Sequence, residues 1–127
     1  MNQTTSGIGA LGEEIARNYL VRKGYRIIES NFRKPWGEID IIAEKERVVR
    51  FVEVKAISGR WDNISRESSE LMPEEQIHSA KLRKIARTAE LYMAEKGDGR
   101  EYQIDAVGVL MDMKLRKAKC RLFEQIL

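Results

Sequence analysis

Residues 48–57 have the sequence Val48-Val49-Arg50-Phe51-Val52-Glu53-Val54-Lys55-Ala56-Ile57, whose β-branched and aromatic side chains predict a β-strand. Successive side chains of a strand point to opposite faces of the sheet, so Glu53 and Lys55 share one face while Val52 and Val54 share the other. A carboxylate and an ammonium are thereby held side by side. This pair has two interpretations. It is either a solvated ion pair on a half-exposed strand or part of a functional site.

A second strand is predicted over residues 38–43, and it carries Asp40. The charged residues 44–47 have the length of a hairpin loop, so the two strands are predicted to be antiparallel. Pairing Ala43 with Val48 places Asp40 opposite Phe51, with Glu53 as a diagonal neighbour at roughly 7–8 Å. A slip of one residue would move Asp40 to the other face. The predicted register therefore brings two carboxylates together.

Asp40, Glu53 and Lys55 are the groups that metal-assisted phosphodiester cleavage requires. Mg²⁺ prefers hard oxygen ligands and keeps several of its waters, so two carboxylates are a suitable partial shell. An ammonium near the attacked phosphate orients the water or stabilises the charge that develops in the transition state. We therefore predict Mg²⁺ (or Mn²⁺) at Asp40 and Glu53, with Lys55 as the third catalytic residue.

The motif Gly37-Glu38-Ile39-Asp40, followed by Phe51-Val52-Glu53-Val54-Lys55, resembles the PD-(D/E)xK signature of restriction-endonuclease-like nucleases. Ile39 stands where that signature has proline. From about Gly9 to the C-terminus, the chain is similar to the YraN-like family of uncharacterised bacterial proteins and, beyond it, to the archaeal Holliday junction resolvases. Further similar residues are Gly9, Gly12, Glu13, Ala16, Asn31, Phe32, Arg33, Lys81, Ile85, Ala89 and residues 104–107.

This resemblance implies a restriction-endonuclease-like α/β fold and a DNA endonuclease acting on branched or repair and recombination intermediates. It also implies that Glu13, on the first helix, helps to bind the metal directly or through water. An ordinary first-turn acid, stabilised by the helix dipole, is the alternative for Glu13. The resemblance further places Lys81, near the start of the second helix, at the scissile phosphate.

The sequence also permits two alternatives to a nuclease that acts as a monomer. The chain could be a catalytically inactive module on the same scaffold that binds nucleic acid or another protein. It could also be a homodimer whose site is completed by the second subunit, because DNA substrates are often two-fold symmetric and the domain is small.

Composition indicates one domain and permits a nucleic-acid partner. The chain has 127 residues, of which 43% are hydrophobic, enough for a single core. Lys and Arg number 23 against 20 Asp and Glu, so the net charge of +3 does not by itself demand an anionic partner. Basic residues are clustered, however, near Lys81 and Lys84 and again over residues 114–121. We predict that Lys81 and Lys84 bind nucleic acid, and a solvated helix face is the alternative.

The predicted order of elements is αβββαββ, giving a mixed sheet flanked by helices. Residues 31–35 are predicted as a turn, residues 1–6 as a flexible tail and residues 58–71 as a mobile loop. Arg60 and Trp61 in that loop could stack on an unpaired base, or Trp61 could pack the loop down. The predicted helices are 8–23 and 72–96, and the predicted strands are 25–29, 38–43, 48–57, 102–111 and 120–126.

Features of the whole chain bear on its location. Cys120 is the single cysteine, so an internal disulfide is excluded and a reducing compartment is favoured. Residues 1–6 are polar and lack the apolar core of a signal peptide, and no run approaches the roughly 20 apolar residues of a membrane span. We expect a cytoplasmic protein that does not enter a membrane.

Overall fold

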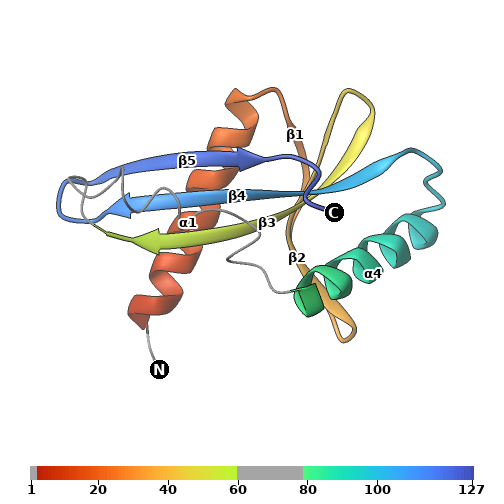
Figure 1. Ribbon diagram of the computed structural model, residues 1–127, viewed down its shortest axis with the longest axis horizontal. Coiled ribbons are helices and arrows are strands. Elements are labelled where there is room, and N and C mark those ends of the chain that lie inside the picture. The colour runs from red at the N-terminus through yellow and green to blue at the C-terminus, as the bar shows by residue number, and fades with distance from the viewer. Residues whose placement is uncertain (1–2, 60–78) are drawn as a thin grey trace.

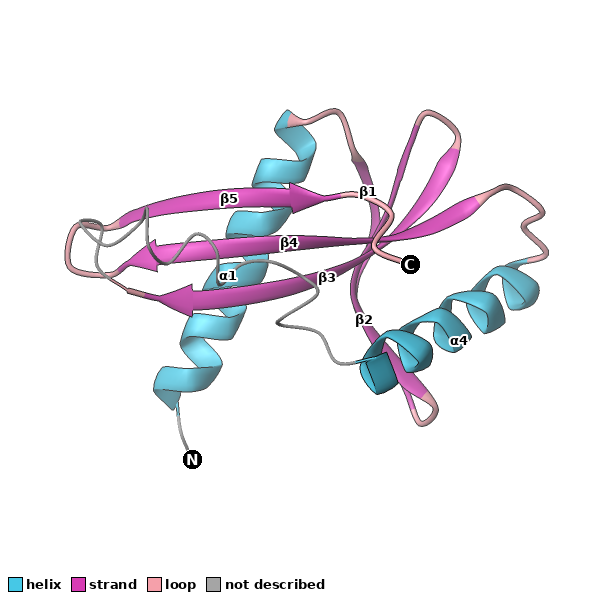
Figure 2. Ribbon diagram, viewed as in Figure 1, coloured by secondary structure: helices cyan, strands magenta, loops and turns pink. Residues whose placement is uncertain are grey.

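The computed structural model describes residues 3–59 and 79–127, which form a five-stranded mixed sheet with a helix on each face (Figure 1). This confirms the predicted α/β class and the order αβββαββ. Figure 2 shows that the strands twist strongly, so that β1 and β2 run across the direction of β3, β4 and β5. The elements are α1 (Gln3–Arg22), β1 (Arg26–Lys34), β2 (Gly37–Lys45), β3 (Val48–Ser58), α4 (Ser79–Lys96), β4 (Tyr102–Asp112) and β5 (Lys117–Phe123).

The strand order in the sheet is β1-β2-β3-β4-β5. Only β3 and β4 are parallel, and the other neighbouring pairs are antiparallel. A parallel pair needs a long crossover, which here includes α4. The central strand β3 therefore carries Glu53 and Lys55 between β2 on one side and β4 on the other.

The two faces of the sheet form separate apolar cores, as the alternation along β3 predicts. Phe51 lies in the core beneath α4, where its ring meets that of Tyr92 edge-to-face at 5.6 Å. Val52 lies in the core beneath α1, with Ala16 and Leu20. Edge-to-face aromatic pairs add about 0.5–1.5 kcal/mol to the stabilisation from burial. Both helices are thus fixed against the strands that carry the candidate site.

The β2–β3 hairpin corrects the predicted register. Its turn is only two residues long, because Lys45 pairs with Val48, and Glu46 and Arg47 have φ angles of 54° and 67°. Two positive φ angles are typical of a turn that matches the twist of the flanking strands, but Glu and Arg are not the residues that usually signal it. Ile42, rather than Asp40, is therefore opposite Phe51. The shift is even, so Asp40 keeps its predicted face.

The predicted turn at residues 31–35 is also wrong. β1 continues to Lys34, which pairs with Gly37, and this leaves Pro35 and Trp36 to connect the strands. Asn31 adopts a positive φ of 54° within the strand. Asparagine commonly favours turns, but here Asn31 causes only a local distortion of β1. The strand continues because Ser30 and Phe32, on either side of Asn31, both pair with β2.

The remaining bounds differ by a few residues. α1 begins at Gln3 rather than at residue 8, and β5 runs over Lys117–Phe123 rather than residues 120–126. The basic side chains of residues 114–119 led to the prediction of a loop up to residue 119. In the structure, Lys117 already pairs with Asp112 in the antiparallel ladder. Arg60 and Trp61, and with them most of the predicted mobile loop, lie outside the described residues. Neither helix within the described part of the chain is long and apolar enough to cross a membrane.

Candidate metal and nucleic-acid site

A cleft of ≈ 380 Å³ opens where β2 and β3 separate, and it is bordered by α1 and the start of α4. It brings together five of the residues that the sequence proposed for the site. Its lining consists of Ile8, Gly9, Glu13, Glu38, Asp40, Glu53, Val54, Lys55, Ala56 and Lys81.

The cleft exists because the β2–β3 ladder ends at the pair Ile41 and Val52. In Figure 1, β2 turns away from β3 beyond this point. The backbone N–H of Val54 then donates to Oδ2 of Asp40 at 2.8 Å. The Asp40 carboxylate thus serves as the acceptor for a β3 amide where the ladder stops. This bond fixes Asp40 at the fork between the two strands.

Glu53 is the most deeply placed acid of the cleft, with a side chain that is only 8% exposed. Burial raises the pKa of its carboxyl to about 8, and a hydrogen bond with Asp40 and the charge of Asp40 add to the effect, against the opposing influence of Lys81. Two adjacent carboxyls cannot both ionise without cost. Burial and the neighbouring Asp40 therefore favour the protonated form of Glu53, and Lys81 opposes them.

Lys81 reaches the cleft from α4. Its Nζ lies 2.5 Å from Oε2 of Glu53, while 60% of its side chain remains exposed. Partial burial lowers the pKa of Lys81, but the hydrogen bond and charge of Glu53, with the charges of Asp40 and Glu38, outweigh this and raise it overall. Lys81 is therefore a cation at neutral pH, and it neutralises part of the acidic charge.

Glu13 enters the cleft because α1 packs unusually close to β3. A Cβ added at Gly12 would lie 2.6 Å from Cβ of Ala56, so only glycine permits this approach. Glu13 follows directly and is half-buried, whereas Glu14 is exposed. The Oε1 atom of Glu13 is buried without a hydrogen-bond partner. Burial raises the pKa of Glu13, and the charge of Asp40 raises it further.

Lys55 lies two residues after Glu53 on β3, and it lines the same cleft with an exposed side chain. The structure therefore places Asp40, Glu53 and Lys55 around one space, as the predicted face of β3 requires.

These residues fit a hard divalent cation. A cation would give the buried Oε1 of Glu13 a partner, and it would offset the repulsion between the adjacent carboxylates of Asp40 and Glu53. Within residues 3–59 and 79–127, no group of three or more acidic, histidine or cysteine side chains is arranged to hold a metal ion. Mg²⁺ sites often use only one or two protein carboxylates, because the ion retains waters and takes oxygens from substrate phosphates, so Asp40 and Glu53 are compatible with such a site.

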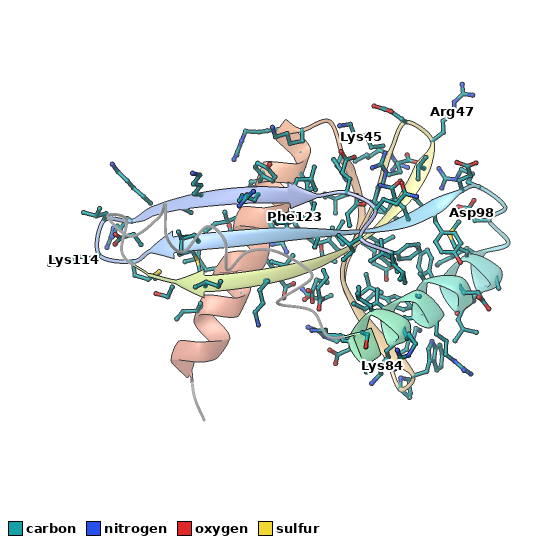
Figure 3. The ribbon with its side chains drawn as sticks, viewed as in Figure 1. Lys45, Arg47, Lys84, Asp98, Lys114 and Phe123 are labelled. Carbon is teal, nitrogen blue, oxygen red and sulfur yellow. The ribbon has the colours of Figure 1, made fainter. Side chains whose placement is uncertain are left out.

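A second hollow of ≈ 430 Å³ adjoins the cleft between the β1–β2 turn and the start of α4. Lys84 lines this hollow rather than the cleft, and Lys81 and Glu38 line both. Figure 3 shows Lys84 near the start of α4 and Lys114 at the opposite end of the molecule. The hollow is lined by Lys34, Pro35, Gly37, Glu38, Ala80, Lys81, Lys84 and Ile85.

Sequence reasoning missed Glu38 and Lys34 as site residues. Glu38 lines the cleft, and its carboxylate also pairs with Arg33 at 2.9 Å. Its position two residues before Asp40 in the quoted motif was a signal that could have identified it. The sequence contained no such signal for Lys34, because residues 31–35 were predicted as a turn and Lys34 is in fact the last residue of β1.

Asp105, by contrast, has the structural role that is common for a buried acid. It is fully buried and accepts hydrogen bonds from Tyr25 Oη (3.0 Å), Gln103 Nε2 (2.8 Å) and the backbone N–H of Gln125 (2.8 Å). Arg50 lies 3.5 Å from the same carboxylate. These partners satisfy the charge of Asp105 within the sheet, away from the cleft.

Comparison with known proteins identifies the family. The model of the uncharacterised protein family UPF0102 matches residues 12–109. A UPF0102 protein of Fervidobacterium nodosum is 38% identical over 100 residues, covering 79% of this chain and 68% of that protein. A UPF0102 protein of Alkaliphilus metalliredigens is 43% identical over 93 residues, covering 73% of this chain and 75% of that protein.

A solved structure, Pyrococcus furiosus SfsA in complex with Ca²⁺, is 22% identical with a TM-score of 0.37, covering 94% of this chain and 63% of that one. A likeness this low supports no statement about fold or ligand. The sequence matches confirm the resemblance to the YraN-like bacterial proteins. On these matches, the chain belongs to the uncharacterised protein family UPF0102.

Proposed function

We propose that this protein is a metal-dependent endonuclease that hydrolyses phosphodiester bonds in DNA. The observation that carries the proposal is the convergence of Asp40, Glu53 and Lys55 in one cleft at the fork of β2 and β3. The same three residues carry the resemblance to the PD-(D/E)xK nucleases. Branched DNA and repair or recombination intermediates are the substrates that this resemblance favours.

The acidic residues would hold the ion, either Mg²⁺ or Mn²⁺. Asp40 and Glu53 would contribute carboxylate oxygens, and the unpartnered oxygen of Glu13 would bind directly or through water. When bound, the ion would polarise the phosphoryl oxygens and lower the pKa of a coordinated water. Asp40 is already fixed by the Val54 amide, so little reorganisation would be needed to present its carboxylate to the ion.

Lys55 and Lys81 would act on the phosphate. The exposed ammonium of Lys55 projects from the same strand as Glu53 and would orient the attacking water or stabilise negative charge as it develops. Lys81 contacts Glu53, and most of its side chain is exposed. Its ammonium would therefore be able to leave the Glu53 carboxylate and bind a substrate phosphate instead. Each lysine also offsets the repulsion between a carboxylate cluster and a polyanion.

Purified protein incubated with branched, single-stranded and duplex DNA, with Mg²⁺ or Mn²⁺, tests the proposal. We expect cleavage of at least one substrate, and a loss of about 100-fold or more in Asp40→Asn and in Glu53→Gln. Glu14→Gln is the control, because it neutralises an exposed acid that does not line the cleft. Thermal melting of each variant shows that it is folded. Undiminished cleavage in both folded variants would remove the assigned roles.

The second candidate is a nucleic-acid-binding module without turnover, and the contact between Lys81 and Glu53 favours it. An ammonium at 2.5 Å already satisfies part of the charge that a metal would satisfy. This candidate predicts DNA binding that weakens steeply with salt, no product with any metal, and no metal-dependent rise in melting temperature. The homodimer and the cytoplasmic location remain predictions, and light scattering with and without DNA tests the first.

A further inference from the structure

We propose that the β1–β2 turn is a stacking platform for single-stranded DNA, in which Trp36 holds an unpaired base while Lys34 and Lys84 bind the neighbouring phosphates. The inference rests on the proposed function and deepens it, because it specifies that the substrate carries an unpaired stretch beside the cleft.

Trp36 lies at the tip of the β1–β2 hairpin with 44% of its surface exposed. Tryptophan normally buries a large apolar area when it serves the core of a protein. Here the turn of Pro35 and Trp36 instead presents the side chain to solvent, between strands whose ladder extends to the pair Lys34 and Gly37. An aromatic side chain in this position can offer its surface to a base at little cost in desolvation.

The hairpin is held in place by α4. A Cβ added at Gly37 would lie 1.9 Å from Oγ1 of Thr88, so the start of β2 packs directly on the helix. Thr88 is itself buried and donates from its hydroxyl to the carbonyl of Lys84 at 2.8 Å. The turn and the helix are therefore positioned relative to one another before any ligand binds, which lowers the entropic cost of binding.

The hollow beside the turn has the chemistry of a phosphate-lined groove. Three of its lining residues are lysines, namely Lys34, Lys81 and Lys84, and Pro35 and Ile85 supply apolar surface. Among the described residues that line it, Glu38 is the one acid, and that carboxylate is paired with Arg33. Its volume of ≈ 430 Å³ lies in the range of pockets that hold small ligands, about 300–1,000 Å³. Cations flanking an apolar floor are complementary to a nucleotide.

The hollow continues into the cleft, since Glu38 and Lys81 line both. Trp36 does not itself line the hollow, but its neighbours Pro35 and Gly37 do. A strand whose base rests on Trp36 would therefore run its backbone along the hollow toward the cleft of Asp40 and Glu53. In a duplex, the faces of the bases are already stacked on one another, so a side chain can take one only from an unpaired segment. The arrangement thus favours a single-stranded segment over continuous duplex.

Tryptophan fluorescence tests the proposal directly. The chain has two tryptophans, so Trp61→Phe leaves Trp36 as the only one. This variant is titrated with oligodeoxythymidylate of about 12 nucleotides and with a blunt duplex of the same length, in EDTA so that cleavage plays no part. We expect the single strand to quench Trp36 emission and the duplex to leave it unchanged.

Anisotropy of labelled DNA then measures affinity in the otherwise unchanged chain. Trp36→Ala should weaken binding of the single strand about tenfold and binding of the duplex less than about twofold, and Trp36→Phe should keep most of the affinity. Leu115→Ala is the matched control, because Leu115 is another large apolar side chain, 51% exposed, outside the β1–β2 hairpin. It should change neither affinity.

Unchanged emission at saturating single strand, or an equal loss of affinity for both oligomers in Trp36→Ala, would overturn the platform. Absence of binding to either oligomer would also overturn it. The outcome is separable from the nuclease proposal. Quenching of Trp36 without cleavage of any DNA would support the stacking platform and contradict the nuclease proposal. Cleavage of single-stranded and duplex DNA that Trp36→Ala does not alter would support the nuclease proposal and contradict the platform.

Discussion

The Nζ atom of Lys81 lies 2.5 Å from Oε2 of Glu53, so a side chain from α4 neutralises a carboxylate on the central strand of the sheet. A divalent cation bound to Asp40 and Glu53 would need the same carboxylate. Lys81 and such a cation would therefore compete for Glu53, and the exposed side chain of Lys81 would let it move away.

At a pH above about 8, where Glu53 is ionised, Lys81→Gln should consequently bind Mg²⁺ more tightly and cleave DNA more slowly. Removing a competing but largely exposed cation should strengthen metal binding by about threefold, while the loss of a phosphate-binding ammonium lowers the cleavage rate. Calorimetric titration and a cleavage assay measure the two effects separately. Lys96→Gln, an exposed residue at the far end of the same helix, should change neither. Weaker metal binding in Lys81→Gln would contradict the competition.

The stability of the wild-type protein should fall as the pH rises from about 4.5 to about 8. Burial raises the pKa of Glu53 from 4.5 to about 8, so across this interval the folded chain retains a proton that the unfolded chain has lost. A state that binds more protons is favoured at low pH. The effect should be on the order of 2 kcal/mol, because the titration is shared with Asp40 and Lys81.

Glu53→Gln resembles the protonated acid and cannot release the proton, so it should lack this dependence. Urea denaturation at about pH 5 and pH 8, without added metal, gives both free energies of unfolding. If the free energy of unfolding depends on pH in the same way in wild type and variant, a group other than Glu53 takes up the proton. In the wild type, Mg²⁺ should bind more tightly at the higher pH, because binding requires the ionised carboxylates.

Gly12→Ala should destabilise the protein by about 1–3 kcal/mol and weaken the metal site. The added Cβ would lie 2.6 Å from Cβ of Ala56, which forces α1 away from β3 and carries Glu13 with it. Gly7→Ala is the matched control on the same helix, because a Cβ there meets nothing within 4 Å. The control should be neutral or stabilising by up to about 1 kcal/mol, since alanine is the better helix former. Equal effects at both positions would exclude the proposed close contact.

Lys84→Gln should reduce the salt dependence of binding to single-stranded DNA. If Lys84 contacts one phosphate, the slope of log K against log salt concentration should become less steep by about 0.7. Titrations at several salt concentrations give the slope. Lys96→Gln serves as the reference, because it removes the same charge from α4 outside the hollow. An unchanged slope in Lys84→Gln would place Lys84 away from the backbone of the DNA.

Lys55→Gln should lower the cleavage rate by about 100-fold while leaving the free energy of unfolding within about 0.5 kcal/mol of wild type. The side chain is exposed at the edge of the cleft, so the fold does not depend on it. Single-turnover cleavage separates this loss from an effect on binding, which should be small. A variant that cleaves normally would show that Lys55 does not act on the reacting phosphate.

The order of the elements and the two faces of the central strand could be predicted from the residue pattern alone. The alternation from Val52 to Lys55 specifies which side chains enter a core and which enter a polar space, because successive strand residues point in opposite directions. Helical periodicity similarly identified α1 and α4. The choice of Glu13 over Glu14 required more than periodicity, since both flank the apolar stripe, and it came from the resemblance at Gly12 and Glu13.

The register of the β2–β3 hairpin, the point where these strands separate and the contacts of Asp40 and Glu53 depend on the folded chain. The two-residue turn at Glu46 and Arg47 sets which residues face each other, and its residue types do not signal it. The bond from the Val54 amide to Asp40 and the contact of Lys81 with Glu53 join separate elements. Such contacts depend on how the helices and strands pack together, and local propensity carries no information about those distances. The residue types of the candidate site could therefore be predicted from the sequence, whereas the raised pKa of Glu53 and its contact with Lys81 arise from packing.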